Sequence, residues 1–537
     1  MASRMLGFVR DAVLTRYLGA GPQLDVFKQA MRTGNLIQNL LGEQTLSAAF
    51  IPQYSRMLEE GREEEAGRFA GAIFGMLLVV AGGLALVGVL FAVPIVTVFS
   101  PGYLQDTAAV AAGTEQVDRF PIAVRLVQIL FPMAGLLVLS AWSIGVLNSH
   151  RRFLVAYLSP VAWNVAIISS ILFVGSRIVD GDPGASSNAV LEQIVIAASV
   201  GALIGGALQF LVQLPVVTRV LKGFRLSVSR NVEGVRKSLA AFWPMLAGRG
   251  AIQLSAHLDG LIASFLAFGA QGIMGLAMTL YLLPLSLFGL SVAAAELPEL
   301  SRRGDWGGEA SARLGGTVRR SAFFVIPTAV GYVAFGLLIV GAVYGGGRFG
   351  RIDSWLMYLV LAAYSLGLPA SGVTRQLNTV FYASGNTRVP ARVGVERVLL
   401  SAAIGGSLAF ALDHFSVNEL IEAGTVEKRL YMGAVGLALG SGIGSWYEVA
   451  RIRHRLAGEH RGIELPTAAL LRMGMCAVLA LAPSAALWYL LRDLVWQRLI
   501  AIPVVALYAL TYLTVTRLAG VSELAAWLDG LPLRRKK

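Results

Sequence analysis

The sequence has little charge and almost no cysteine. Charged residues make up 14% of its 537 residues, whereas hydrophobic residues make up 56%. This is more apolar side chain than one soluble core can bury, which excludes a soluble globular protein. The one cysteine, Cys476, excludes a disulfide framework and a cysteine-based metal cluster, and the five histidines show no metal-ligand spacing. Glycine and proline are frequent but lie inside long apolar runs, which predicts an all-α polytopic membrane protein.

The motifs of an enzyme are also missing. No glycine-rich loop of the Walker type occurs, so the chain is not expected to hydrolyse ATP. No Ser/His/Asp arrangement for nucleophilic catalysis stands out, and no cofactor or metal is predicted. The net charge of +13 would suggest nucleic acid in a soluble protein. Here it reflects Lys and Arg in the loops between apolar segments, so no nucleic-acid partner is expected.

Fourteen apolar segments are long enough to cross the membrane, since about 20 residues span roughly 30 Å of hydrocarbon. The loops that follow the even-numbered spans, together with the C-terminal tail, carry several times more Lys and Arg than the opposite loops. The positive-inside rule therefore predicts that both termini lie in the cytoplasm. The acidic segments around 180–182 and 413–427 are then expected outside.

The chain contains an internal repeat. The pattern Asp-x-Val-Leu-Thr-x-Tyr-Leu-x-x-Gly at 11–21 recurs as Asp-x-Leu-Ile-Ala-x-Phe-Leu-x-x-Gly at 259–269, and Ile-Pro-Gln-Tyr-Ser-Arg at 51–56 is matched by Leu-Pro-Glu-Leu-Ser-Arg at 297–302. The alternative is chance similarity between two apolar helices, but the matches include Asp, Pro and Ser-Arg. An even number of spans in each copy predicts two lobes related by a pseudo-twofold axis along the membrane normal, with a substrate site between them, as in transporters.

The repeat gives the expected domain organisation. Two six-helix lobes are followed by two further spans that have no counterpart in the repeat, and then by a basic tail. The predicted boundaries are 1–220 for the N-terminal lobe, 235–460 for the C-terminal lobe, 465–520 for accessory spans 13 and 14, and 521–537 for the cytoplasmic tail.

Polar residues recur at spacings of three and four in several spans, which places them on one helix face. Such stripes predict a shared polar chamber, with neighbours such as Val26 facing lipid. The first stripe could instead belong to an interfacial helix. Lone Arg249 could instead be a structural partner of Asp259. An excess of cations favours an anionic ligand, because guanidinium groups match phosphate oxygens. The stripes are Asp25, Lys28, Arg32, Asn35 and Asn39; Arg249, Gln253, His257 and Asp259; and Ser371, Arg375, Asn378 and Tyr382.

Specific residues carry a family likeness. The start Ser3–Asp11, followed by Leu18–Gly21 and then by Asp25 and Asn35, resembles the MurJ (MviN) lipid II flippases. Further matches extend over spans 1 to 12, as at 205–215 and 364–383. The resemblance implies the fold of the multidrug/oligosaccharidyl-lipid/polysaccharide exporter superfamily, a central cationic cavity, alternating access, and a groove at spans 13 and 14 for a polyprenyl tail. It also implies the transfer of lipid II across the bacterial cytoplasmic (inner) membrane for peptidoglycan and cell-wall biosynthesis.

The resemblance transfers family positions to particular residues. The arginines of the family's first helix fall on Arg4 and Arg10, and its acidic and amide positions in helix 2 fall on Asp25 and Asn35. Two expected arginines are absent, because Gln38 and Thr279 stand in their places. We expect nearby cations to substitute. The predicted substrate-binding set is Arg4, Arg10, Asp25, Lys28, Arg32, Asn35, Arg249 and Arg375.

The sequence is also compatible with other functions. The missing arginines favour a divergent branch, and the cargo could be another polyprenyl-diphosphate-linked oligosaccharide, of the O-antigen or capsule type. A cation-coupled drug antiporter would need an acidic chamber, and a non-transporting scaffold would not need the stripes. Asp259 and Asn378 are candidates for coupling to sodium or protons, and the membrane potential is the alternative driving force. Glu43, Glu396 and Glu448 are further carboxylates that could carry an ion, unless each pairs with a neighbouring arginine.

Overall fold

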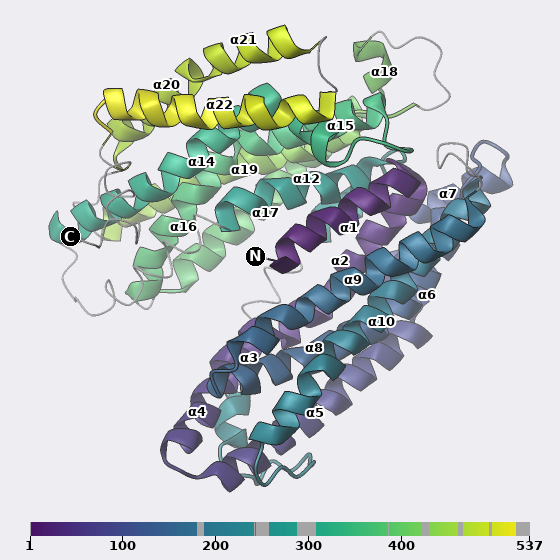
Figure 1. The fold of residues 1–537 in the computed structure, drawn as a ribbon, viewed down its shortest axis with the longest axis vertical. Coiled ribbons are helices and arrows are strands. Elements are labelled where there is room, and N and C mark those ends of the chain that lie inside the picture. The colour runs from purple at the N-terminus through teal and green to yellow at the C-terminus, as the bar shows by residue number, and fades with distance from the viewer. Residues whose placement is uncertain are drawn as a thin grey trace. The chain divides into compact units, whose positions relative to one another are not determined.

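The described residues lie mostly in helices (Figure 1). The computed structural model describes residues 2–179, 187–240, 242, 257–286, 308–384, 386–421, 429–459, 465–492, 497–521 and 523. Within these ranges, extended pairing is limited to two isolated bridges, Gly346 with Phe349 and Ser416 with Tyr431. The prediction of an all-α protein is confirmed.

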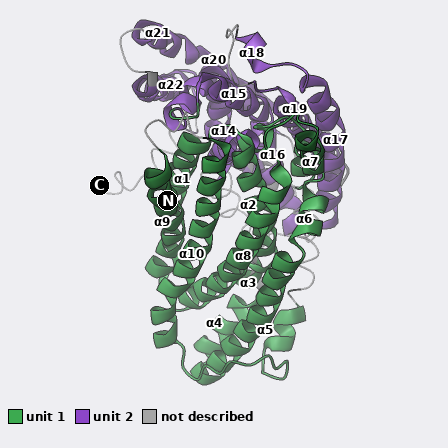
Figure 2. Ribbon diagram, turned by 90° about the vertical axis from the view of Figure 1, so that its right-hand side faces the viewer, with its two compact units in different colours: residues 1–272, 346–349 green, residues 273–345, 350–537 purple. Residues whose placement is uncertain are grey.

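The chain divides into two compact units, coloured separately in Figure 2. Unit 1 comprises 1–272 and 346–349, and unit 2 comprises 273–345 and 350–537. The labelled helices of unit 1 are α1 (Ala2–Leu18), α2 (Pro22–Leu41), α3 (Glu43–Ala49), α4 (Ile51–Glu59), α5 (Glu63–Leu90), α6 (Ala92–Phe99), α7 (Tyr103–Ala111), α8 (Arg119–Ser149), α9 (Phe153–Ile178) and α10 (Asn188–Val220).

The remaining labelled helices belong to unit 2, except that α12 begins at the end of unit 1. They are α12 (Ala270–Pro284), α14 (Gly308–Val343), α15 (Arg351–Leu366), α16 (Leu368–Ala383), α17 (Arg388–Leu412), α18 (Val417–Leu420), α19 (Gly433–Glu459), α20 (Thr467–Leu479), α21 (Leu481–Leu491) and α22 (Gln497–Leu518).

Nine helical segments in the described part of the chain are long and apolar enough to cross a membrane. They coincide with nine of the fourteen predicted spans, and α1, α2, α12 and α19 overlap four more. Of the span predicted at 270–297, the structure describes residues 270–286. The remaining span, expected at 238–267, is described only in part. About fourteen spans therefore fit the structure, and some consist of two helices in succession, such as α15 with α16 and α20 with α21.

The units do not divide where the repeat places the lobe boundary. Residues 257–272, expected to begin the second lobe, group with unit 1. Polar contacts explain this grouping, since Arg119 Nη2 donates to the carbonyls of Ser264 and Leu266 at 3.3 and 3.4 Å. Residues 346–349 also group with unit 1, where Arg348 N donates to the Arg16 carbonyl at 3.0 Å. The predicted lobe boundaries stay a prediction.

Glycines bring α17 and α19 into close contact within unit 2. A Cβ atom on Gly440 would lie 2.3 Å from the Cα of Gly405, and one on Gly444 would lie 1.9 Å from Ser401 Oγ. Small residues four positions apart allow membrane helices to approach backbone to backbone. The same two helices share the ion pair between Arg397 and Glu448.

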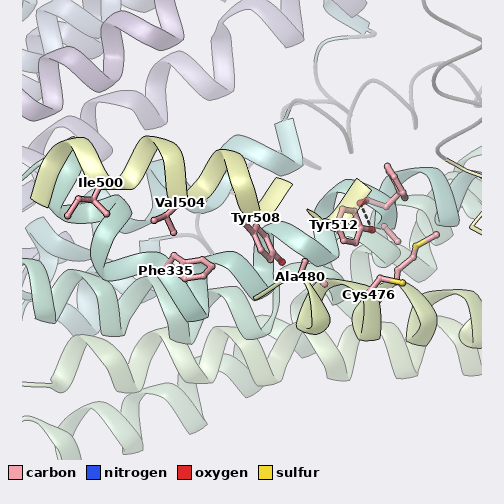
Figure 3. Close-up of a cluster of buried hydrophobic side chains, with 11 residues drawn as sticks. Phe335, Cys476, Ala480, Ile500, Val504, Tyr508 and Tyr512 are labelled. Atoms are coloured by element: carbon pink, nitrogen blue, oxygen red, sulfur yellow. Dashed lines mark hydrogen bonds between the residues drawn. The ribbon is translucent and has the colours of Figure 1, made fainter. Parts of the chain in front are cut away.

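The accessory helices pack against α14, which contains Pro327, in a cluster of buried hydrophobic side chains (Figure 3). Pro327 has no amide hydrogen, so the carbonyl of Phe323, four residues earlier, loses its helical partner. The Tyr512 hydroxyl on α22 donates to that carbonyl at 2.9 Å, and the Tyr508 hydroxyl donates to the Pro327 carbonyl at 2.9 Å. An orphaned carbonyl is costly in an apolar environment, so Tyr512 supplies the donor that Pro327 lacks, and both tyrosines anchor α22 on α14.

The loop that follows α10 lies along α5. A Cβ atom on Gly67, Gly71 or Gly75 would come within 1.8 to 2.2 Å of a carbonyl oxygen of residues 222–227. Only glycine at these three positions leaves room for the loop backbone. Further along this loop, Glu233 accepts a hydrogen bond from Arg62, the residue that precedes α5.

Candidate substrate-binding site

The first polar centre lies between α1 and α2 and consists of Arg10, Asp11 and Lys28, which we call the Asp11 centre. Arg10 Nη2 lies 2.9 Å from one carboxylate oxygen of Asp11, and Lys28 Nζ lies 2.9 Å from the other. The Asp11 side chain is fully buried, whereas those of Arg10 and Lys28 are 16% and 13% exposed. Two partly accessible cations thus share one buried carboxylate, and the centre carries one surplus positive charge.

Residues of helix α9 also contact Arg10. Arg10 Nη1 donates to Asn164 Oδ1 at 3.3 Å, and the guanidinium lies 5.4 Å from the centroid of the Trp163 ring. Asn164 Nδ2 in turn donates to its own helix at the Pro160 carbonyl, at 3.1 Å, and to the Ser3 carbonyl at 3.4 Å. The guanidinium is therefore oriented by an amide and an aromatic face as well as by Asp11.

The second polar centre consists of Asp25, Asp106 and Arg119, which we call the Asp25 centre. Arg119 Nε donates to Asp106 at 2.5 Å, and Arg119 Nη1 lies 3.5 Å from Asp25. The Asp25 carboxylate also accepts the backbone amides of Gly269 and Gly272 at 2.7 and 2.6 Å. Because α12 begins at Ala270, Asp25 caps the amino end of α12.

Burial sets the Asp25 centre apart from the Asp11 centre. The Asp25 and Arg119 side chains are 0% and 3% exposed. Two rings enclose the Arg119 guanidinium, which lies 4.6 Å from the Tyr103 centroid and 4.7 Å from that of Phe268. The described contacts of Asp25 are those of a helix cap, and its predicted contact with a substrate stays a prediction.

The other predicted residues of spans 1 and 2 are only partly buried. Arg4 is exposed on α1, and Arg32 and Asn35 are half-buried on α2. His257 Nε2 lies 3.3 Å from the backbone carbonyl of Arg32. The expectation that Val26 faces lipid is wrong, since it is 0% exposed. Residue 26 follows Asp25 at the packed end of α2, and the exposed face of this helix widens only toward its carboxyl end.

Some predictions fall where the structure gives no description. Arg249 and Gln253 lie outside the described residues. Asp259 is described and half-buried, in the segment that groups with unit 1. Its predicted role in ion coupling stays a prediction.

Unit 2 holds a third polar group, which we call the Glu448 cluster. Arg397 Nη1 of α17 lies 3.2 Å from Glu448 of α19, and Arg375 of α16 interacts electrostatically with both. Asn378 is half-buried one turn beyond Arg375. The cluster also includes hydroxyls joined by hydrogen bonds of 2.8 Å between Tyr281 and Ser371 and 3.2 Å between Ser371 and Ser445.

Sequence reasoning missed Arg119, Asp106 and Arg397. Arg119 and Asp106 lie near span ends, where a charged residue normally indicates a solvated loop. Arg119 lies on the predicted outer side, where the positive-inside rule predicts few arginines. This exception was the feature of the sequence that could have indicated a structural role for Arg119. Arg397 lies inside a predicted span, next to Glu396 and five residues after Arg392, so it resembled part of an exposed charge run.

Charged groups held inside a bundle of membrane-spanning helices mark a transport pathway more often than a scaffold, because each is expensive to keep there. The fold and these centres therefore define a polytopic helical membrane transporter. The family model described as "Lipid II flippase MurJ" matches residues 14–510. The chain belongs to this family.

Individual relatives agree with the family assignment. A probable lipid II flippase MurJ of Vibrio cholerae is 26% identical over 97% of this chain and 94% of its own length. One of Aquifex aeolicus is 28% identical over 80% of each chain, and the lipid II flippase MurJ of Burkholderia cenocepacia is 27% identical over 83% of this chain and 79% of its own.

Solved structures support the fold. A lipid II flippase MurJ in an inward closed conformation superposes with a TM-score of 0.71 at 21% identity, covering 96% of both chains. An inward-facing multidrug resistance MATE family transporter of the MOP superfamily gives a TM-score of 0.61 at 13% identity, covering 85% of this chain and 95% of its own. Both structures therefore share the overall fold of this chain.

Proposed function

We propose that this protein is a flippase that moves lipid II from the inner to the outer leaflet of the bacterial cytoplasmic membrane by alternating access, for peptidoglycan synthesis. Membership of the lipid II flippase family supports this proposal. The chemical observation that carries it is the Asp11 centre, where Arg10 and Lys28 share a single carboxylate and remain partly accessible. An anionic ligand would balance the surplus charge.

The diphosphate of the lipid is the part that resists transfer. A bare diphosphate is very costly in hydrocarbon, so cations must replace its water while the polyprenyl tail stays in lipid. Arg10 supplies a planar fork that matches two phosphate oxygens, and Lys28 supplies a point charge. We assign Arg4, Arg32 and Asn35 to the same task on α1 and α2, with Arg249 and Arg375 as predicted contacts from later spans.

The proposal includes an orientation and a driving force. Both termini lie in the cytoplasm, and sodium, protons or the membrane potential drives transport, with Asp259 and Asn378 as coupling residues. Glu115 and Arg152 are both exposed and lie on opposite predicted sides. In a Cys476→Ser background, an impermeant thiol reagent should label Glu115→Cys in intact cells and Arg152→Cys only after permeabilisation. The reverse pattern would overturn the topology.

Complementation of a cell depleted of its own lipid II flippase tests the function. The unaltered chain should restore growth and lipid II transfer, Arg10→Ala should fail, and Arg10→Lys should restore only part because the fork is lost. Arg16→Ala is the matched control, since Arg16 is exposed at the other end of α1. If the unaltered chain is expressed in the membrane and restores nothing, lipid II is not the cargo.

A second cargo is favoured by one observation. Thr279 stands where the family has an arginine, and its hydroxyl donates to the Gly275 carbonyl of its own helix at 3.0 Å, so it supplies no charge. A different polyprenyl-diphosphate-linked oligosaccharide would share the diphosphate and differ in the sugars. Complementation of a strain lacking an O-antigen flippase, with no rescue of the lipid II-depleted strain, would favour this cargo.

A further inference from the structure

The Glu448 cluster is a second place where cations outnumber carboxylates. Its charged members are Arg375, Arg397 and Glu448, contributed by three helices of unit 2. Within the described residues, the titratable groups that face Glu448 are these two arginines and Tyr382, and Tyr281 also interacts with it electrostatically. One carboxylate among two guanidinium groups leaves one positive charge unbalanced.

Accessibility differs sharply between the partners. The Glu448 side chain is 9% exposed, whereas that of Arg397 is 33% exposed and Arg375 is half-buried. One turn before Glu448, Gly444 packs closely against Ser401 of α17. A ligand can therefore reach the arginines from the exposed side, while Glu448 contacts Arg397 from the buried side.

We infer that Arg375 and Arg397 form a binding position for a phosphate-type anion, which the Glu448 carboxylate occupies in the absence of the anion and leaves when the anion binds. This inference rests on the proposed function, because the diphosphate of the flipped lipid is the anion meant. Two guanidinium groups on adjacent helices can hold the two phosphates with charge-assisted hydrogen bonds.

Displacement of Glu448 has a consequence for protons. A buried carboxylate that loses its arginine is left unpaired in a medium of low dielectric constant, which is costly. It regains neutrality by taking one proton from water, so that the carboxylate becomes a carboxylic acid and no other bond changes. Binding of the anion is then linked to uptake of one proton, and lower pH favours binding because it supplies that proton.

The same two helices provide a matched control. Glu396 of α17 accepts hydrogen bonds from Tyr447 at 3.0 Å and Arg451 at 3.3 Å, both on α19. Its side chain is 26% exposed, so water can replace its partners. Glu396→Gln removes a carboxylate from the same helix pair without touching the proposed position.

The test uses the full chain, purified in detergent, and inorganic pyrophosphate as the probe. Titration calorimetry in buffers of different ionisation enthalpy counts the protons taken up on binding. The unaltered chain should take up one proton more per bound pyrophosphate than Glu448→Gln. Since the competing carboxylate is gone, Glu448→Gln should also bind about tenfold more tightly, equivalent to about 1.4 kcal/mol. Glu396→Gln should match the unaltered chain in both respects.

A double variant separates binding from folding. Arg397→Gln combined with Glu448→Gln removes both members of the 3.2 Å ion pair, so neither is left without the other. This variant should fold, yet it should lose the tighter binding of the single variant. Equal proton counts in Glu448→Gln and the unaltered chain would overturn the inference, as would the same change in Glu396→Gln. Lipid II transfer by the unaltered chain is measured in parallel. Transfer without the difference in protons rejects this inference alone, whereas the difference without transfer rejects the proposed cargo.

Discussion

The two carboxylate centres of unit 1 both include a residue of α2, and they differ in the partners of their aspartates. Asp11 contacts two side-chain cations that are partly exposed. Asp25 contacts two backbone amides and an arginine that is 3% exposed. The partners of Asp11 can turn toward a ligand, while those of Asp25 are fixed in the backbone or enclosed by rings.

This difference shows how to separate binding from architecture among charged residues in a membrane protein. Both aspartates are 0% exposed, so burial of the carboxylate alone does not distinguish them. The exposure of the cationic partner does distinguish them. A partly exposed cation has hydrogen-bond donors that a ligand can reach, whereas the donors of an enclosed cation are used in contacts within the protein.

The largest expected effect is at the Asp25 centre. Arg119→Ala leaves Asp106 and Asp25 buried without their cation, and breaking a buried pair in this way costs about 3 to 5 kcal/mol. We expect the variant to melt well below the unaltered chain in detergent, and Asp25→Ala to do the same because α12 loses its cap. An Asp25→Ala protein with unchanged melting but no transport would instead give Asp25 a direct role with substrate.

Lys28→Ala should give the next largest effect, on transport rather than on stability. Asp11 keeps Arg10 as a partner at 2.9 Å, so no buried charge is left alone. Loss of one charge-assisted contact worth about 1.5 to 3 kcal/mol should weaken lipid II binding by roughly tenfold or more. Binding and melting are measured on the same preparation. Normal binding together with lower melting would show that the two centres do not differ in kind.

Tyr512→Phe tests a buried polar contact that carries no charge. Loss of the hydrogen bond to the Phe323 carbonyl should cost about 1 kcal/mol, with no effect on lipid II binding. In a Pro327→Ala background, an amide can return to that carbonyl, so the same tyrosine substitution should cost less. An equal loss of stability in the two backgrounds would mean that Tyr512 does not compensate for the amide hydrogen that Pro327 lacks.

The smallest effect is expected at the surface of the loop after α10. The hydrogen bond from Arg62 holds the pKa of Glu233 below its usual range. A depressed carboxyl pKa adds stability that is present near neutral pH and is lost as the pH falls through that pKa. Glu233→Gln should therefore lower the melting temperature slightly at neutral pH and have no effect in acid. A large effect at neutral pH would contradict the rule that exposed pairs contribute little.

Much of the fold could be read from the sequence because lipid imposes strong local rules. A span must be long and apolar, which made the α5, α8 and α10 segments recognisable without tertiary information. The three-four spacing on α2 predicted a polar face, and the structure places two of its residues, Asp25 and Lys28, in two different centres. The spacing could not indicate which residues face a neighbouring helix, and Val26 was misplaced for that reason.

The partners of the charged residues could not be read in the same way. Asp25 binds amides 244 and 247 residues away, and Arg397 binds a carboxylate 51 residues away. No local pattern encodes such distances. The loop-like position of Arg119 also gave no sign that two rings and two carboxylates would enclose it.

The sequence by itself determined the class of protein, the number of spans and the presence of surplus cations within them, because these follow from hydropathy and charge along the chain. Only the tertiary structure decided which cations are accessible and which are consumed by the fold. Asp11 with Lys28 and Asp25 with Arg119 are similar pairs in the sequence. They become a candidate binding centre and a helix cap through what packs around each of them, since an ion pair in an apolar environment is governed by its whole surroundings.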